Sequence, residues 1–224
     1  MMAGETLGKR IAVVTGGTGA LGTAVAQRFA ESGYETHVTS SREADARAWT
    51  GPGLAHAVDL ADLDAVRRLA ASFSDIHAIA LCAGGFAMAK LADFTEADLD
   101  RMMTSNFKTA SFALGAFGGR MRAGASAVVV GSQSYEGAAG SAFYSASKAA
   151  VVSLVKSAAL EWKKEQVRVN AVLPDTIDTP ANRRAMPGAD FTRWASPQEI
   201  ADVIVWLCSP EARAVTGNAI KVGR

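Results

Sequence analysis

Short runs of β-branched and apolar residues alternate along the whole chain with longer stretches of helical periodicity. The short runs predict seven strands, at residues 11–15, 34–39, 54–58, 76–82, 127–130, 167–173 and 218–222. Helical patterns fall between them, at residues 20–31, 61–73, 95–121, 142–164 and 197–208. Strict alternation of this kind predicts a doubly wound α/β fold, in which a mostly parallel seven-stranded sheet carries helices on both faces.

Length and composition are those of one domain that spans residues 1–224. Of these residues 49% are hydrophobic, enough for one sizeable core. The formal net charge is +1 and the charged residues are scattered, so no surface for nucleic acid or anionic membrane is expected, and the partner is a small molecule. Residues 1–9 lack the apolar core of a signal peptide, and no apolar run is long enough to span a membrane, which predicts a cytoplasmic protein.

Cysteine and histidine usage indicates structural roles. Cys82 and Cys208 both lie in apolar patterns, which predicts buried thiols in a reducing compartment and no disulfide. The three histidines share no ligand spacing, so no metal site is predicted. Trp162 and Trp206 lie in helical patterns and are expected to pack, whereas Trp194 fits either a lid or surface packing.

A glycine-rich turn joins the first strand to the first helix. Glycines in this context permit a tight turn, close approach of backbone N–H groups to a phosphate, and close packing of the helix on the sheet. The chain is therefore predicted to bind a dinucleotide in a Rossmann-type arrangement, through Gly16, Thr18, Gly19, Ala20, Leu21 and Gly22.

The end of the second strand indicates which dinucleotide is preferred. NAD-binding sites carry an acidic residue there for the ribose hydroxyls, but this chain has Ser40, Ser41 and Arg42, with no carboxylate to repel a 2′-phosphate. Hydroxyl groups and a guanidinium favour NADP(H), with NAD(H) still possible, unless Arg42 is only a solvated loop residue. After the third strand, Asp59 and Leu60 are placed to meet the adenine, although Asp59 also suits capping of the next helix.

Tyr144 and Lys148 stand four residues apart in a predicted helix. This spacing puts both side chains on one face, where an ammonium group can lower the pKa of a phenol. The pair predicts general acid–base chemistry.

Further motifs follow the later strands: Cys82-Ala83-Gly84-Gly85, then Asn106, a serine after the fifth strand, and Pro174 with Thr179. Together with the glycine turn and the Tyr-Lys pair, they resemble the short-chain dehydrogenase/reductase family over essentially the whole chain. The resemblance implies additional cofactor contacts from Cys82, Ala83, Gly84, Gly85, Tyr144, Lys148, Pro174, Thr176, Ile177 and Thr179.

The same resemblance implies catalytic roles for four residues. Tyr144 would exchange the substrate proton, and Lys148 would lower its pKa and bind the nicotinamide ribose. Asn106 would hold a water in the proton relay, and a serine would orient the substrate oxygen. Ser132 fits the end of the fifth strand, while Ser134 is also allowed by the family's pattern.

A narrower likeness concerns residues 171–191, which are similar to the dihydropteridine reductases. It implies reduction of a quinonoid dihydropterin. Ser40 in place of an acid, and serines after the fifth strand, are instead traits of carbonyl reductases, so a ketone or a quinone remains an alternative substrate. A non-catalytic NADPH-binding redox sensor is a further alternative. Family resemblance implies a homodimer or homotetramer through the helices at 95–121 and 142–164.

Overall fold

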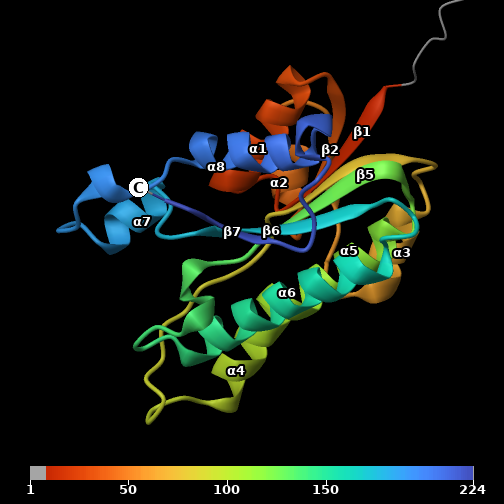
Figure 1. Cartoon of the computed structure of the whole chain (residues 1–224). Helices are drawn as coiled ribbons and strands as arrows, with labels where there is room; N and C mark the ends of the chain where they lie inside the picture. The colour runs from red at the N-terminus through yellow and green to blue at the C-terminus, as the bar shows by residue number, and fades with distance from the viewer. Residues whose placement is uncertain (1–8, 224) are drawn as a thin grey trace, which may run out of the picture.

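The computed structural model describes residues 9–223 and contains one parallel sheet of seven strands (Figure 1). The order of the strands is β3-β2-β1-β4-β5-β6-β7, so the chain starts in the middle of the sheet and winds outward in both directions. The predicted fold class is confirmed. The strands are β1 (Arg10–Thr15), β2 (Tyr34–Ser40), β3 (Leu54–Ala57), β4 (Ile76–Leu81), β5 (Met121–Val130), β6 (Arg168–Pro174) and β7 (Ala219–Val222). Residues 1–8, where no signal peptide is expected, lie outside the described residues.

Helices cover both faces of the sheet (Figure 1). On one face, α1 (Ala20–Glu31) and α8 (Pro197–Cys208) bury their apolar sides against β1 and its neighbours. On the other face, α3 (Leu63–Ala70), α5 (Thr109–Gly118) and α6 (Ala142–Glu161) enclose a second core. Three short helices are α2 (Glu43–Arg47), α4 (Glu96–Met102) and α7 (Pro180–Ala185). No helix among residues 9–223 is long and apolar enough to cross a membrane.

The segment predicted as a helix at residues 95–121 is helical without a break from residue 96 to residue 118, and only its end is wrong. Its start is correct, because Thr95 and Asp98 form a capping box at α4. A wide π-helical turn, η1 (Met103–Lys108), connects α4 to α5, and α5 ends at Gly118. Met121 already belongs to β5, where it pairs with Ile76 of β4. The polar start of β5 resembles a helix end in the sequence, and only pairing with a strand more than forty residues away makes it a strand.

The tryptophans differ in their surroundings. Trp162 packs on Gly118, where an added Cβ would lie 2.1 Å from its ring, as predicted. Trp206 is 46% exposed, so the prediction that it packs is wrong; its position on α8 faces away from the sheet. Trp194 is 8% exposed and its ring lies 4.8 Å from that of Phe191 at an angle of 52°, which favours packing over an open lid.

The surroundings of the cysteines and of two histidines indicate structural roles. Cys82 and Cys208 are free thiols, and burial raises the pKa of each to about 12. His37 Nδ1 lies 3.0 Å from His56 Nε2 on the neighbouring strand, and burial lowers the pKa of both imidazoles. Among residues 9–223, no group of three or more His, Cys, Asp or Glu side chains is arranged to hold a metal ion.

Candidate functional site

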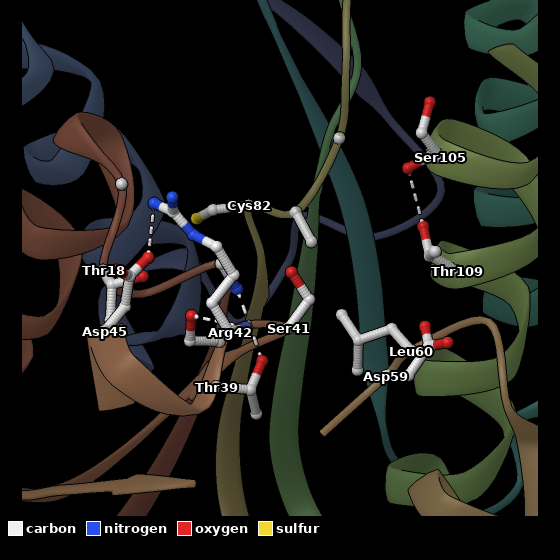
Figure 2. A pocket seen from close by; sticks show the side chains of 15 residues that line it. Thr18, Thr39, Ser41, Arg42, Asp45, Asp59, Leu60, Cys82, Ser105 and Thr109 are labelled. Atoms are coloured by element: carbon white, nitrogen blue, oxygen red, sulfur yellow. Dashed lines mark hydrogen bonds and ion pairs between the residues drawn. The ribbon is translucent and has the colours of Figure 1, made fainter. Parts of the chain in front are cut away.

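A pocket of about 470 Å³ opens at the carboxyl ends of β1, β2 and β4 (Figure 2). In an open parallel sheet, this edge is where the strand order reverses direction and where ligands bind. The pocket is lined by Gly16, Thr18, Gly19, Thr39, Ser40, Ser41, Arg42, Asp45, Asp59, Leu60, Cys82, Ala83, Gly84, Ser105 and Thr109.

The glycine turn at the base of the pocket leaves no room for side chains. Gly16 has a φ of +63°, and an added Cβ there would lie 2.9 Å from the backbone of Ala83. At Gly22 an added Cβ would lie 2.2 Å from the carbonyl oxygen of Gly16. Gly19 caps α1 without a side-chain hydrogen bond, so the first N–H groups of that helix are available to an anion. The turn therefore provides a close-fitting backbone surface for a phosphate.

The end of β2 forms the polar side of the pocket. Ser40 is buried and its hydroxyl accepts a hydrogen bond from the Arg42 backbone N–H at 3.3 Å. The Arg42 side chain extends toward Asp45, and the two form an ion pair at 2.5 Å (Figure 2). The expectation that no carboxylate is present at this end is wrong. The second strand itself ends without an acid, but the short helix α2 brings Asp45 back to the pocket.

Eleven of the residues predicted to bind cofactor come together in this pocket, from the glycine turn, the end of β2, the segment after β3 and the segment after β4. Asp59 also accepts a hydrogen bond from the Ala61 N–H at 2.9 Å, while the cap of α3 is Asp62 rather than Asp59. The predicted residues that do not line the pocket are Ala20, Leu21, Gly22, Gly85, Tyr144, Lys148, Pro174, Thr176, Ile177 and Thr179.

These outlying residues occupy four places. Ala20, Leu21 and Gly22 form the first turn of α1, in which Leu21 and Gly22 are buried, and Gly85 follows β4 directly after the lining residue Gly84. The segment after β6 stands apart from the pocket: Thr179 caps α7 by accepting from the Asn182 N–H, and Ile177 forms a β-bridge with Ala195. Tyr144 and Lys148 lie on α6.

Four lining residues were not predicted, namely Thr39, Asp45, Ser105 and Thr109. Asp45 stands three residues after Arg42, a spacing that favours an ion pair on a helix and offered a signal in the sequence. Ser105 and Thr109 precede and follow Asn106 in the chain, on the helical segment that faces the sheet edge. The buried Ser105 hydroxyl has no hydrogen-bond partner in the structure, as expected of a group that meets a ligand.

Asn106 connects three elements from within the π-helical turn. Its Oδ1 accepts from the Gly85 N–H at 3.0 Å, and its Nδ2 donates to the Gly85 carbonyl at 3.0 Å and to the Ser147 hydroxyl at 3.1 Å. The wide turn brings this amide between the segment after β4 and helix α6. Its predicted role in holding a water stays a prediction.

Helix α6 presents the Tyr-Lys pair beside the end of β5. The Ser132 hydroxyl lies close enough to the Tyr144 phenol to lower its pKa, and it accepts from the Ser134 N–H at 3.2 Å. Lys148 is buried, and its ammonium donates to the Val130 carbonyl at 2.9 Å and lies 5.8 Å from the centre of the Tyr144 ring. Of the two candidate serines, Ser132 is therefore the one in contact with the phenol.

The electrostatics of the pair are set mainly by burial. Burial raises the pKa of Tyr144 above its ordinary value, and the hydrogen bond from Ser132 opposes this only in part. Burial also lowers the pKa of Lys148 to about 8. Desolvation is the largest effect on the phenol and Lys148 is not among the groups that shift its pKa, so the role of Lys148 in lowering this pKa stays a prediction. At neutral pH, Tyr144 is a protonated phenol that can donate a proton.

The pocket suits a nicotinamide dinucleotide. An anion can bind the uncapped N-terminus of α1, and Arg42 and two serines stand where an adenosine ribose would lie.

Comparisons with known proteins agree with this geometry. Residues 17–223 match the family model described as enoyl-(acyl carrier protein) reductase. The chain is 33% identical to a cis-4-hydroxycyclohexanecarboxylate dehydrogenase from Sinomonas cyclohexanicum, over 98% of this chain and 97% of the relative. It is 31% identical to a galactitol 2-dehydrogenase from Rhizobium johnstonii, over 94% of this chain and 92% of the relative. A solved structure of BdcA in complex with NADPH is 28% identical, has a TM-score of 0.85, and is matched over 96% of this chain and 93% of that one.

The comparisons do not support the narrower resemblance to dihydropteridine reductases. They do support the wider one, since the family model covers almost the whole chain and the dehydrogenase relatives share the full length of the fold. The chain belongs to the short-chain dehydrogenase/reductase family.

Proposed function

We propose that this protein is an NADP(H)-dependent reductase that transfers hydride to a small carbonyl compound. The observation that carries the proposal is the placement of the Ser132 hydroxyl beside the protonated Tyr144 phenol, where it acts to lower the phenol's pKa. Two adjacent hydroxyl groups, one of them a proton donor, suit a carbonyl oxygen that gains negative charge during reduction.

The glycine turn, Ser40, Ser41 and Arg42 would hold the cofactor, with the pyrophosphate at the N-terminus of α1. When bound, the cofactor supplies the hydride. NADP(H) is favoured over NAD(H) because Arg42 is positively charged and lines the pocket, and the related structure in complex with NADPH supports the same choice.

The chain's own residues handle the proton. Tyr144 would donate its phenolic proton to the substrate oxygen, and Ser132 would orient that oxygen. Lys148 is a positioning residue: its buried ammonium is fixed by the Val130 carbonyl beneath the phenol. Because the pKa of Tyr144 lies above its ordinary value, the phenol is protonated at neutral pH, and the proton that reduction requires is present.

Phe86 gives the surface beside the proton donor an apolar character. Its ring stands edge-on to Tyr144 at 4.9 Å between ring centres and is 62% exposed. A substrate with a planar or apolar body would cover this ring. Both aromatic ketones and quinones meet that description, and a quinonoid dihydropterin is planar as well.

Substrate class is tested by comparing an aromatic ketone, a quinone and quinonoid dihydropterin, each with NADPH and NADH. We expect the ketone to be reduced fastest, with NADPH preferred. The variant Ser132→Ala should slow ketone reduction by roughly 10- to 1,000-fold, because it removes a hydroxyl from the developing oxyanion. Ser134→Ala is the matched control and should stay within about threefold, since only the backbone N–H of Ser134 contacts Ser132.

Faster turnover with dihydropterin, unaffected by Ser132→Ala, would replace the carbonyl proposal by the pterin one. Tight NADPH binding without turnover of any substrate would favour a redox sensor.

We also propose a homodimer or homotetramer in which α4 and α6 meet a second copy of the chain. Leu99 of α4 is 36% exposed and Leu160 of α6 is 76% exposed, so both helices have uncovered apolar surface. Sedimentation that shows only the 23.3 kDa monomer would contradict this assembly.

A further inference from the structure

The ion pair between Arg42 and Asp45 occupies the part of the pocket where the cofactors NADP(H) and NAD(H) differ. Asp45 lies in the first turn of α2, and its carboxylate meets the Arg42 guanidinium at 2.5 Å. Both residues line the pocket beside Ser40 and Ser41 (Figure 2). The guanidinium side chain is 77% exposed and the carboxylate side chain 31% exposed, so the acid is the more enclosed partner.

Among the described residues that line the pocket, no second positive side chain accompanies Arg42. Two carboxylates, Asp45 and Asp59, line the same pocket. The remaining acid of α2, Glu43, pairs with Arg47 and does not line the pocket. Asp45 therefore offsets part of the charge that Arg42 brings to the site.

We propose that Asp45 is a specificity-determining residue of the cofactor site. By pairing with Arg42, Asp45 weakens the binding of a 2′-phosphate. As a result, a cofactor whose ribose carries no 2′-phosphate can compete for the site. A phosphate that contacts Arg42 must either displace the Asp45 carboxylate from the guanidinium or remain close to that carboxylate, which repels it. A ribose with a free 2′-hydroxyl meets neither cost, and its hydroxyl can donate to a carboxylate. The inference rests on the proposed use of this pocket for NADP(H).

The test measures binding of two fragments by isothermal titration calorimetry, without turnover. Adenosine 2′,5′-bisphosphate carries the distinguishing phosphate, and adenosine 5′-monophosphate lacks it. For Asp45→Asn we expect the bisphosphate to bind about 10-fold more tightly, because Arg42 is released and a like charge is removed. The monophosphate should change by less than about threefold, or weaken.

Glu43→Gln is the matched control, since it removes the same charge from the same helix without touching the pocket. It should alter neither affinity by more than about twofold. Asp45→Ala repeats the test without an amide that could itself bind phosphate, and circular dichroism checks that α2 variants remain folded.

Two outcomes would overturn the inference. Weaker bisphosphate binding in Asp45→Asn would mean that Asp45 aligns Arg42 for the phosphate instead of competing with it. An equal gain in Glu43→Gln would mean that only overall charge matters. Failure of the proposed cofactor preference would give a different result. The unmodified protein would then bind the monophosphate more tightly than the bisphosphate, but Asp45→Asn would still shift the ratio of the two affinities toward the bisphosphate.

Discussion

Replacing Tyr144 with phenylalanine is expected to lower turnover by about 100- to 10,000-fold while leaving NADPH affinity within about threefold, because a positioned general acid contributes this much to rate. The phenol is half-buried and its hydroxyl contacts Ser132, whereas the ring edge packs on Phe86. Phenylalanine keeps the ring and its packing and removes only the oxygen. Steady-state kinetics with the best ketone substrate, and NADPH titration by fluorescence, measure the two quantities separately.

Tyr135→Phe provides the control for loss of a phenol oxygen. The Tyr135 hydroxyl donates to the carboxylate of Glu136 at the surface. Its removal should change turnover by less than about twofold. Undiminished turnover in Tyr144→Phe with every substrate tried would contradict the assignment of this residue as the acid.

Gly22→Ala is expected to destabilise the fold by about 2–4 kcal/mol and to weaken NADPH binding by at least about 10-fold. Alanine is the better helix former by about 1 kcal/mol, so helix propensity alone predicts a gain at this position in α1. The steric clash outweighs this gain in helix propensity and makes the net change in stability unfavourable. The new Cβ would lie 2.2 Å from the Gly16 carbonyl oxygen and 2.6 Å from the Gly17 Cα. Both neighbours are backbone atoms of the cofactor turn, so relief of the clash must move that turn.

Gly115→Ala is the matched control for this substitution. Gly115 lies within α5, and an added Cβ there meets no atom within 4 Å. The exchange should stabilise the protein by roughly 0.5–1 kcal/mol through helix propensity alone. Urea unfolding measures both changes. A Gly22→Ala protein as stable as the parent would show that the turn can relax without cost and would remove the steric basis of the cofactor prediction.

Much of the sheet and the pocket could be predicted from local pattern. Strands such as β1 and β6 are buried on both faces, so their apolar runs are continuous and easy to recognise. The glycine turn is equally easy to recognise in the sequence, because glycine is required where one backbone segment approaches another closely, as at Gly16. Eleven predicted cofactor residues meet in one pocket for this reason.

Other features depend on contacts that local pattern does not record. The first residues of β5 look like a helix end and become a strand only beside β4. The π-helical turn around Asn106 is fixed by bonds to Gly85 and Ser147, which are distant in the chain. The pKa of Tyr144 follows from its burial, which spacing to Lys148 does not reveal.

The sequence by itself determined the class of fold, the dinucleotide turn and the family, because alternation, glycine requirements and a four-residue spacing are local properties of the chain. Only the tertiary structure decided that Ser132 rather than Ser134 meets Tyr144, and that Asp45 turns back onto Arg42 in the cofactor pocket. Both outcomes depend on how a short segment is oriented by its neighbours after folding. The free energy that fixes such an orientation comes from packing and pairing between elements, which is distributed over residues far apart in the sequence.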